Sequence, residues 1–163
     1  MPPPYAEFFN DHLQLAVKEK LRHLHYNPQG KRNYARIYRV QNVMIHYSVA
    51  FRPTIQNQRQ PAEVETELFF SYSVRDRNLR LAREAEPMLR RFEARIKELG
   101  YIYKYDDEGR KGQNGDPMNR VRCSARFQGG IDELSRWPEY CSRIVQILEE
   151  LDHEFGAWID TAR

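Results

Sequence analysis

The stretch Asn42–Arg52, which reads NVMIHYSVAFR, decides the fold class because apolar side chains occupy every second position. Successive side chains of a β-strand point to opposite faces of the sheet. One face would therefore carry Val43, Ile45, Tyr47, Val49 and Phe51, and the other Met44, His46, Ser48, Ala50 and Arg52. This period of two predicts a strand that buries one face in the core.

Four further stretches are typical of strands. Tyr34–Val40 and Glu63–Val74 flank the first one, and Tyr101–Asp106 with Asn119–Phe127 form a second group. The turn at Gln41-Asn42 suits a tight hairpin. Because the strands come in hairpins and do not alternate with helices, the sequence favours an antiparallel sheet.

Three apolar stripes of helical spacing surround these strands. They predict helices over Tyr5–His25, Asp76–Leu99 and Ser135–Asp160. Asp76 is a candidate N-cap of the second helix, and Pro87 predicts a kink or two abutting helices. The expected fold is a single α+β domain over residues 1–163, with five antiparallel strands in the order α-βββ-α-ββ-α. We expect all three helices on one face.

Composition fits a globular chain. Hydrophobic residues make up 40% of the 163 residues and aromatic residues 12%. No apolar run approaches the roughly 20 residues that span a bilayer, and the start Met1–Tyr5 lacks the pattern of a signal peptide. We therefore expect a cytoplasmic protein with no membrane contact. Cys123 and Cys141 lack metal-site spacing, which indicates buried reduced thiols.

Charge is unevenly distributed along the chain. The net charge is +8 over residues 1–130 and −5 over 131–163, and arginine outnumbers lysine 20 to 6. A nucleic-acid surface is one interpretation, since arginine binds phosphate in a bidentate manner. Arginine-rich codon usage is the simpler alternative.

Catalytic and cofactor motifs are not recognisable. Gly109, Gly112 and Gly115 lie between two strands and precede no helix, so they predict a hairpin tip rather than a phosphate loop. His23 and His25 lie two residues apart, which is poor spacing for a metal pair on a helix. No nucleophile motif is present. We therefore predict no catalytic activity, no cofactor and no bound metal.

Three glutamates share one face of the predicted strand Glu63–Val74: Glu63, Glu65 and Glu67. Paired carboxylates can hold Mg²⁺, so a metal-dependent nuclease is one hypothesis. Charged residues on a half-buried strand more often mark its solvated face, and we expect that here.

The sheet face opposite the helices is the candidate binding surface. Its residues would include Arg36, Tyr38, His46, Phe69, Arg120, Arg122 and Arg126. A basic, aromatic surface suits nucleic acid, and the same mixture suits a dimer interface. The three glutamates would repel phosphate, so a homodimer that buries Tyr38, Met44 and Phe69 is the preferred prediction.

The stretch Gly130-Ile131-Asp132, followed by Trp137-Pro138-Glu139-Tyr140 before the last helix, resembles a prokaryotic family, domain of unknown function 4268. The order of predicted elements resembles it as well. The resemblance implies a strand-rich middle flanked by helices and a DNA-processing or defence context. It assigns no functional residues. The expected function is a non-catalytic, self-associating interaction domain, with nucleic-acid binding as the alternative.

Overall fold

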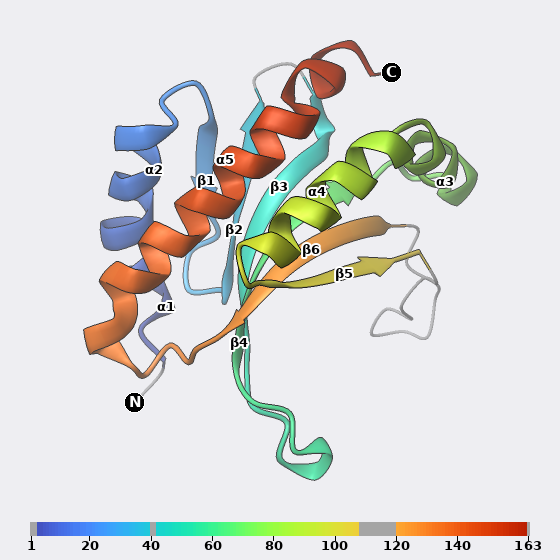
Figure 1. Ribbon diagram of the computed structural model, residues 1–163. Coiled ribbons are helices and arrows are strands. Elements are labelled where there is room, and N and C mark those ends of the chain that lie inside the picture. The colour runs from blue at the N-terminus through green and yellow to red at the C-terminus, as the bar shows by residue number, and fades with distance from the viewer. Residues whose placement is uncertain (1–2, 40–41, 108–119, 163) are drawn as a thin grey trace.

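The structure is a computed structural model that describes residues 3–39, 42–107 and 120–162 (Figure 1). Within these ranges the chain forms one antiparallel sheet and four helices. The predicted α+β class and antiparallel sheet are therefore confirmed. The predicted counts are wrong, since the sheet has six strands rather than five and a fourth helix is present.

The six strands are ordered β1-β2-β3-β4-β6-β5, and every neighbouring pair is antiparallel. Their bounds are β1 His25–Pro28, β2 Tyr34–Arg39, β3 Asn42–Arg52, β4 Glu63–Phe70, β5 Ile102–Asp106 and β6 Val121–Gln128. β3 covers the whole alternating stretch. The predicted hairpin residue Gln41, the strand ends Val40 and Asn119, and the three loop glycines lie outside the described residues.

The additional strand, β1, begins at His25, the last residue of the predicted first helix, and that helix itself ends earlier than predicted. The backbone leaves the helical conformation at Leu21, where φ is −131° and ψ is 57°. Tyr26 then pairs with Ile37 of β2, and its hydroxyl donates to the carbonyl of Phe9 at 2.8 Å. Leu21 and Leu24 are both buried, so their helical spacing was satisfied by packing without a helix.

The N-terminal helix runs without interruption through α1 (Tyr5–Glu7), a π-helical segment η1 (Phe8–Leu13) and α2 (Gln14–Lys20). The last helix, α5 (Trp137–Thr161), follows a short 3₁₀ turn, η3 (Leu134–Arg136).

The predicted second helix consists of two abutting helices, α3 (Arg75–Glu84) and α4 (Glu86–Glu98). Pro87 lies in the first turn of α4, where its missing N–H breaks no hydrogen bond. The N-cap of α3 is Val74, so the prediction that Asp76 caps this helix was wrong.

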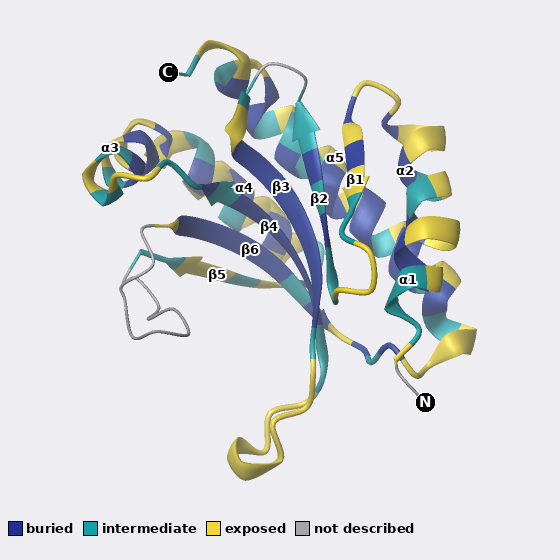
Figure 2. Ribbon diagram, turned by 180° about the vertical axis from the view of Figure 1, so that it is seen from behind, coloured by how far each residue is buried: buried dark blue, intermediate teal, exposed yellow. Residues whose placement is uncertain are grey.

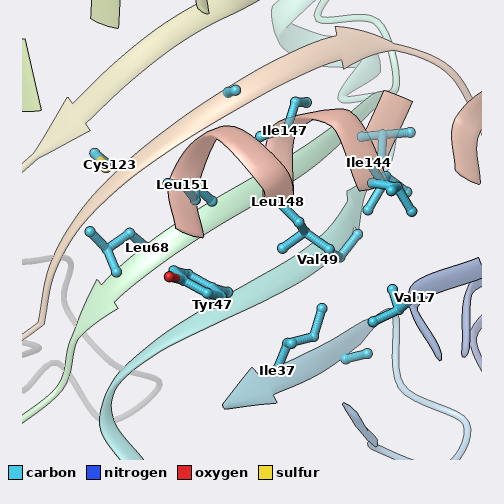
Figure 3. Close-up of a cluster of buried hydrophobic side chains, with 14 of the residues drawn as sticks. Val17, Ile37, Tyr47, Val49, Leu68, Cys123, Ile144, Ile147, Leu148 and Leu151 are labelled. Carbon is cyan, nitrogen blue, oxygen red and sulfur yellow. The ribbon is translucent and has the colours of Figure 1, made fainter. Parts of the chain in front are cut away.

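The layers are a sheet with helices on one face. α5 crosses the middle of this face, flanked by the N-terminal helix and α4 (Figure 1). The apolar residues of β3 and α5 meet in the core (Figure 3), where Tyr47, Val49, Ile144 and Leu148 are fully buried. We call the other face, which no described helix crosses, the open face (Figure 2).

Candidate functional site

The open face carries all of the predicted binding residues. Arg36, Tyr38, His46, Phe69, Arg120, Arg122 and Arg126 lie on β2, β3, β4 and β6 or directly before β6. The register pairs His46 with Phe69, and Phe69 with Arg122. The structure divides these residues between two neighbouring groups, an ion-pair cluster and a recess.

The ion-pair cluster consists of Arg52, Glu65, Glu67, Arg122 and Arg126. Glu65 and Glu67 are 0% and 1% exposed, so the prediction that these glutamates are solvated was wrong. Glu63, the third predicted carboxylate, lies at the margin, with Oε1 3.8 Å from Nη1 of Arg126.

Three arginines from two strands, Arg52 on β3 and Arg122 and Arg126 on β6, neutralise the two buried glutamates. Arg52 Nη2 donates to Oε1 of Glu65 at 2.9 Å and to Oε1 of Glu67 at 3.0 Å. Arg122 Nη1 donates to the same two oxygens at 3.1 and 2.8 Å, and Arg126 forms an ion pair with Glu65. Burial lowers the pKa of Arg122, and nearby Glu65 acts in the opposite direction. The negative charges of the two carboxylates are therefore balanced by arginines within the sheet.

The recess adjoins this cluster and has a volume of about 340 Å³. Its lining comes from the segment before β6 and from β2, β3 and β4 with the loop before β2: Arg32, Asn33, Tyr34, Arg36, His46, Ser48, Ala50, Arg52, Glu67, Phe69 and Arg120. Four of the eleven are arginines and one is a glutamate. The recess is therefore a basic cavity on the open face.

Aromatic rings and guanidinium groups alternate along the recess. The rings of His46 and Phe69 stack with centroids 5.5 Å apart, and Tyr38 lies against His46 at 5.4 Å. The guanidinium of Arg120 lies 5.7 Å from the Phe69 ring centroid, and that of Arg36 lies 5.7 Å from the Tyr34 ring centroid. Such contacts hold arginine side chains in place while leaving their N–H groups available.

The pKa of His46 reflects the burial and the positive charge of this recess. Burial, together with the positive charges of Arg36 and Arg120, lowers the pKa of His46 to about 4. A hydrogen bond between Nδ1 and the Val43 carbonyl, 3.1 Å away, acts in the opposite direction. The imidazole is therefore neutral at pH 7, in a positive field from two sides.

Residues that the sequence did not single out include Arg32 and Tyr34. They continue the alternation of Arg36 and Tyr38 in steps of two, so the pattern was present in the sequence. Arg52 had been placed on the same strand face as His46, but its partners were not foreseeable.

Candidate metal sites and reactive thiols are not supported by the described part of the chain. No group of three or more His, Cys, Asp or Glu side chains there is arranged to hold a metal ion. Cys123 and Cys141 are free and buried, as predicted, and burial raises the pKa of Cys123 to about 12 and that of Cys141 to about 11. Their thiols are therefore poor nucleophiles.

A second polar network ties α5 to the sheet through Asp152. Its carboxylate accepts hydrogen bonds from Arg39 Nη1 at 2.5 Å and the Tyr47 hydroxyl at 2.9 Å, and lies 2.5 Å from His23 Nε2. Burial raises the pKa of Asp152, but these three contacts more than offset it and keep the pKa below its ordinary value. Arg39 also binds Asp160. The network joins α5 to β2, β3 and the loop after α2.

The described helices include none with the length and apolar character needed to cross a membrane. In comparisons with known proteins, the chain matches no family model, no curated protein and no solved structure. The resemblance to domain of unknown function 4268 thus stays a prediction from Gly130–Asp132 and from Trp137–Tyr140, which form the first turn of α5.

Proposed function

We propose that the open face binds single-stranded nucleic acid. The observation that carries this proposal is a set of three arginines, Arg32, Arg36 and Arg120, that form no ion pair with any carboxylate in the described ranges. They lie beside the rings of Tyr34 and Phe69. Guanidinium groups without a carboxylate partner suit phosphates, and adjoining rings suit unstacked bases.

Repulsion between the strand glutamates and phosphate would weaken the binding of nucleic acid, but the structure places two of these glutamates in ion pairs. Glu65 and Glu67 are buried and bound by Arg52, Arg122 and Arg126, so their charges are balanced within the sheet. Arg32, Arg36 and Arg120 have no such balance among the residues that the structure describes. This distribution favours an anionic ligand over a second copy of the same face, which would bring like charges together.

Single strands suit this face better than a duplex. Aromatic side chains can reach only those bases that are unstacked, and in a duplex the bases are stacked and paired. The rings of Tyr38 and Phe69 are only partly exposed on an antiparallel sheet backed by helices. A strand laid across such a sheet can place successive bases against the rings and phosphates against the arginines.

Fluorescence anisotropy with labelled single-stranded oligonucleotides tests this proposal. Affinity should fall steeply with salt, with about 0.7 units of log–log slope for each phosphate that is neutralised. Arg36→Ala and Arg120→Ala should each weaken binding and reduce the slope by about that amount. Arg80→Ala, an exposed arginine on α3, is the matched control and should bind like the parent chain. Absence of binding at low salt would overturn the proposal.

Self-association remains an alternative with its own test. Met44 is 42% exposed on the open face, which also carries the partly buried Tyr38 and Phe69. Sedimentation at tens of micromolar would show a dimer if these residues form an interface, and Phe69→Glu should then convert it to a monomer. A strictly monomeric mass in both proteins would exclude this interface.

A further inference from the structure

The recess differs from the rest of the open face in shape and in charge. The strand residues beneath it are buried, with Ser48 4% and His46 8% exposed, so it has a protein floor. Arg36 on β2 and Arg120 before β6 stand at opposite sides, separated by β3 and β4. A group that entered would be held from both sides, whereas a flat surface contacts its ligand from one side.

The donors that remain available in the recess are mainly guanidinium groups. Ser48 Oγ already donates to the Ala35 carbonyl, and Asn33 Nδ2 already donates to the Phe51 carbonyl. Arg52 is engaged by both buried glutamates. Arg32 donates from Nη1 to the Tyr34 hydroxyl at 2.8 Å and keeps its other N–H groups, so Arg32, Arg36 and Arg120 can each still offer several donors.

Three guanidinium groups around one small cavity match a group with three terminal oxygens and a charge near −2. A phosphodiester within a strand has two non-bridging oxygens and a single negative charge. A phosphate monoester has three terminal oxygens and a charge between −1.5 and −2 at pH 7. Guanidinium–phosphate contacts of this kind are charge-assisted and strong.

We infer that the recess binds a terminal phosphate monoester, either at the end of a nucleic-acid strand or on a free mononucleotide. This inference rests on the proposed function, because the bases of the same ligand would lie on the rings beside the recess. The face would then recognise strand ends rather than the interior of a strand.

His46 supplies a readout that is separate from affinity. The groups that face it are Arg36 from β2, Arg120 before β6, the rings of Tyr38 and Phe69, and the Val43 carbonyl. A phosphate bound to Arg36 and Arg120 would offset the positive charges that lower the pKa of His46. That pKa should therefore rise when the recess is filled, which a proton NMR titration of the imidazole measures.

The test compares one oligonucleotide sequence with a 5′-phosphate, a 3′-phosphate or hydroxyl ends, together with adenosine monophosphate. We expect at least tenfold tighter binding of one phosphorylated end, and an upward shift of the His46 titration with that ligand. Arg36→Ala and Arg120→Ala should remove this preference, while Arg80→Ala retains it. Arg120 is exposed, so its variant should fold even if Arg36→Ala does not.

The outcomes separate the two proposals. Equal affinity for all oligonucleotide ends, with an unchanged His46 titration, would overturn this inference and leave the proposed function in place. Tight binding of adenosine monophosphate with no gain for an oligonucleotide would support the recess and overturn the nucleic-acid function. No binding of any of these ligands would overturn both.

Discussion

Replacing Arg122 with methionine should test whether the ion-pair cluster holds the sheet together. Arg122 contacts Oε1 of Glu65 at 3.1 Å and Oε1 of Glu67 at 2.8 Å, and its side chain is 8% exposed. Methionine would fill much of the same space without a charge. Glu67 would keep only Arg52, at 3.0 Å, and would remain buried.

The expected loss of unfolding free energy in Arg122→Met follows from these contacts. Removing one partner of a buried ion pair costs about 3–5 kcal/mol because a buried charge loses its compensation. Both glutamates retain a second arginine, so we expect the lower end, about 3 kcal/mol of unfolding free energy. For a chain of this size that loss lowers the melting temperature by roughly 6–12 °C.

Urea denaturation followed by circular dichroism measures this loss. Arg90→Met is the matched control, because Arg90 forms an exposed pair with Glu86 and such pairs contribute about 0–1 kcal/mol. The double variant Arg122→Met with Glu67→Met should recover part of the loss, since it removes both charges of one pair. A loss below about 1 kcal/mol in Arg122→Met would refute the reasoning, because the cluster would then not depend on this arginine.

Three further predictions concern pH, backbone packing and the α5 network. The pKa of His46 is lowered to about 4 in the folded chain, so its contribution to stability is complete above about pH 6.5 and is lost as pH falls towards 4. When the pH is lowered from 7 to 5, the unfolding free energy of the parent should fall by about 2 kcal/mol more than that of His46→Gln, as measured by urea denaturation. Equal losses in the two proteins would contradict this. Gly129→Ala would place a Cβ 2.5 Å from the buried Tyr140 ring and should cost about 1–3 kcal/mol, whereas Gly130→Ala meets nothing closer than 3.8 Å. Similar thermal stability of these two variants would show that the ring can move aside. Asp152→Ala should lower the unfolding free energy by about 2–4 kcal/mol, because it leaves Arg39 and the Tyr47 hydroxyl without their shared acceptor. Asp160→Ala is the control, since the Asp160 side chain is 41% exposed, and it should lower the unfolding free energy much less in the same assay.

The sequence predicted those elements whose signal is local. The alternation of Asn42–Arg52 identified β3 with its bounds, and Pro87 indicated the boundary between α3 and α4. The first helix was predicted too long because Leu21 and Leu24 have a spacing that a helix and an irregular buried segment satisfy equally well. Four residues of strand, His25–Pro28, are too few to show a period of their own.

The sequence could predict which strand residues share the open face, but not which side chains become partners there. Alternation along each strand placed Arg36, His46 and Phe69 on one face. The glutamates were expected in water because the arginines that neutralise them lie far away in the chain, with Arg122 57 residues from Glu65. Which strands become neighbours depends on the order β3-β4-β6, and no local pattern of residues encodes that order.

The position of α5 after the six described strands has a consequence for synthesis of the protein. α5 supplies eleven buried residues to the core and covers the middle of the sheet. Until those residues have been translated, the apolar face of β3 and β4 has no cover there, although every strand has already been made. At about 5–20 residues per second, the 25 residues of α5 take about 1–5 s to synthesise. The nascent sheet is thus exposed to aggregation for seconds on each ribosome, and a premature stop before Trp137 would make that exposure permanent.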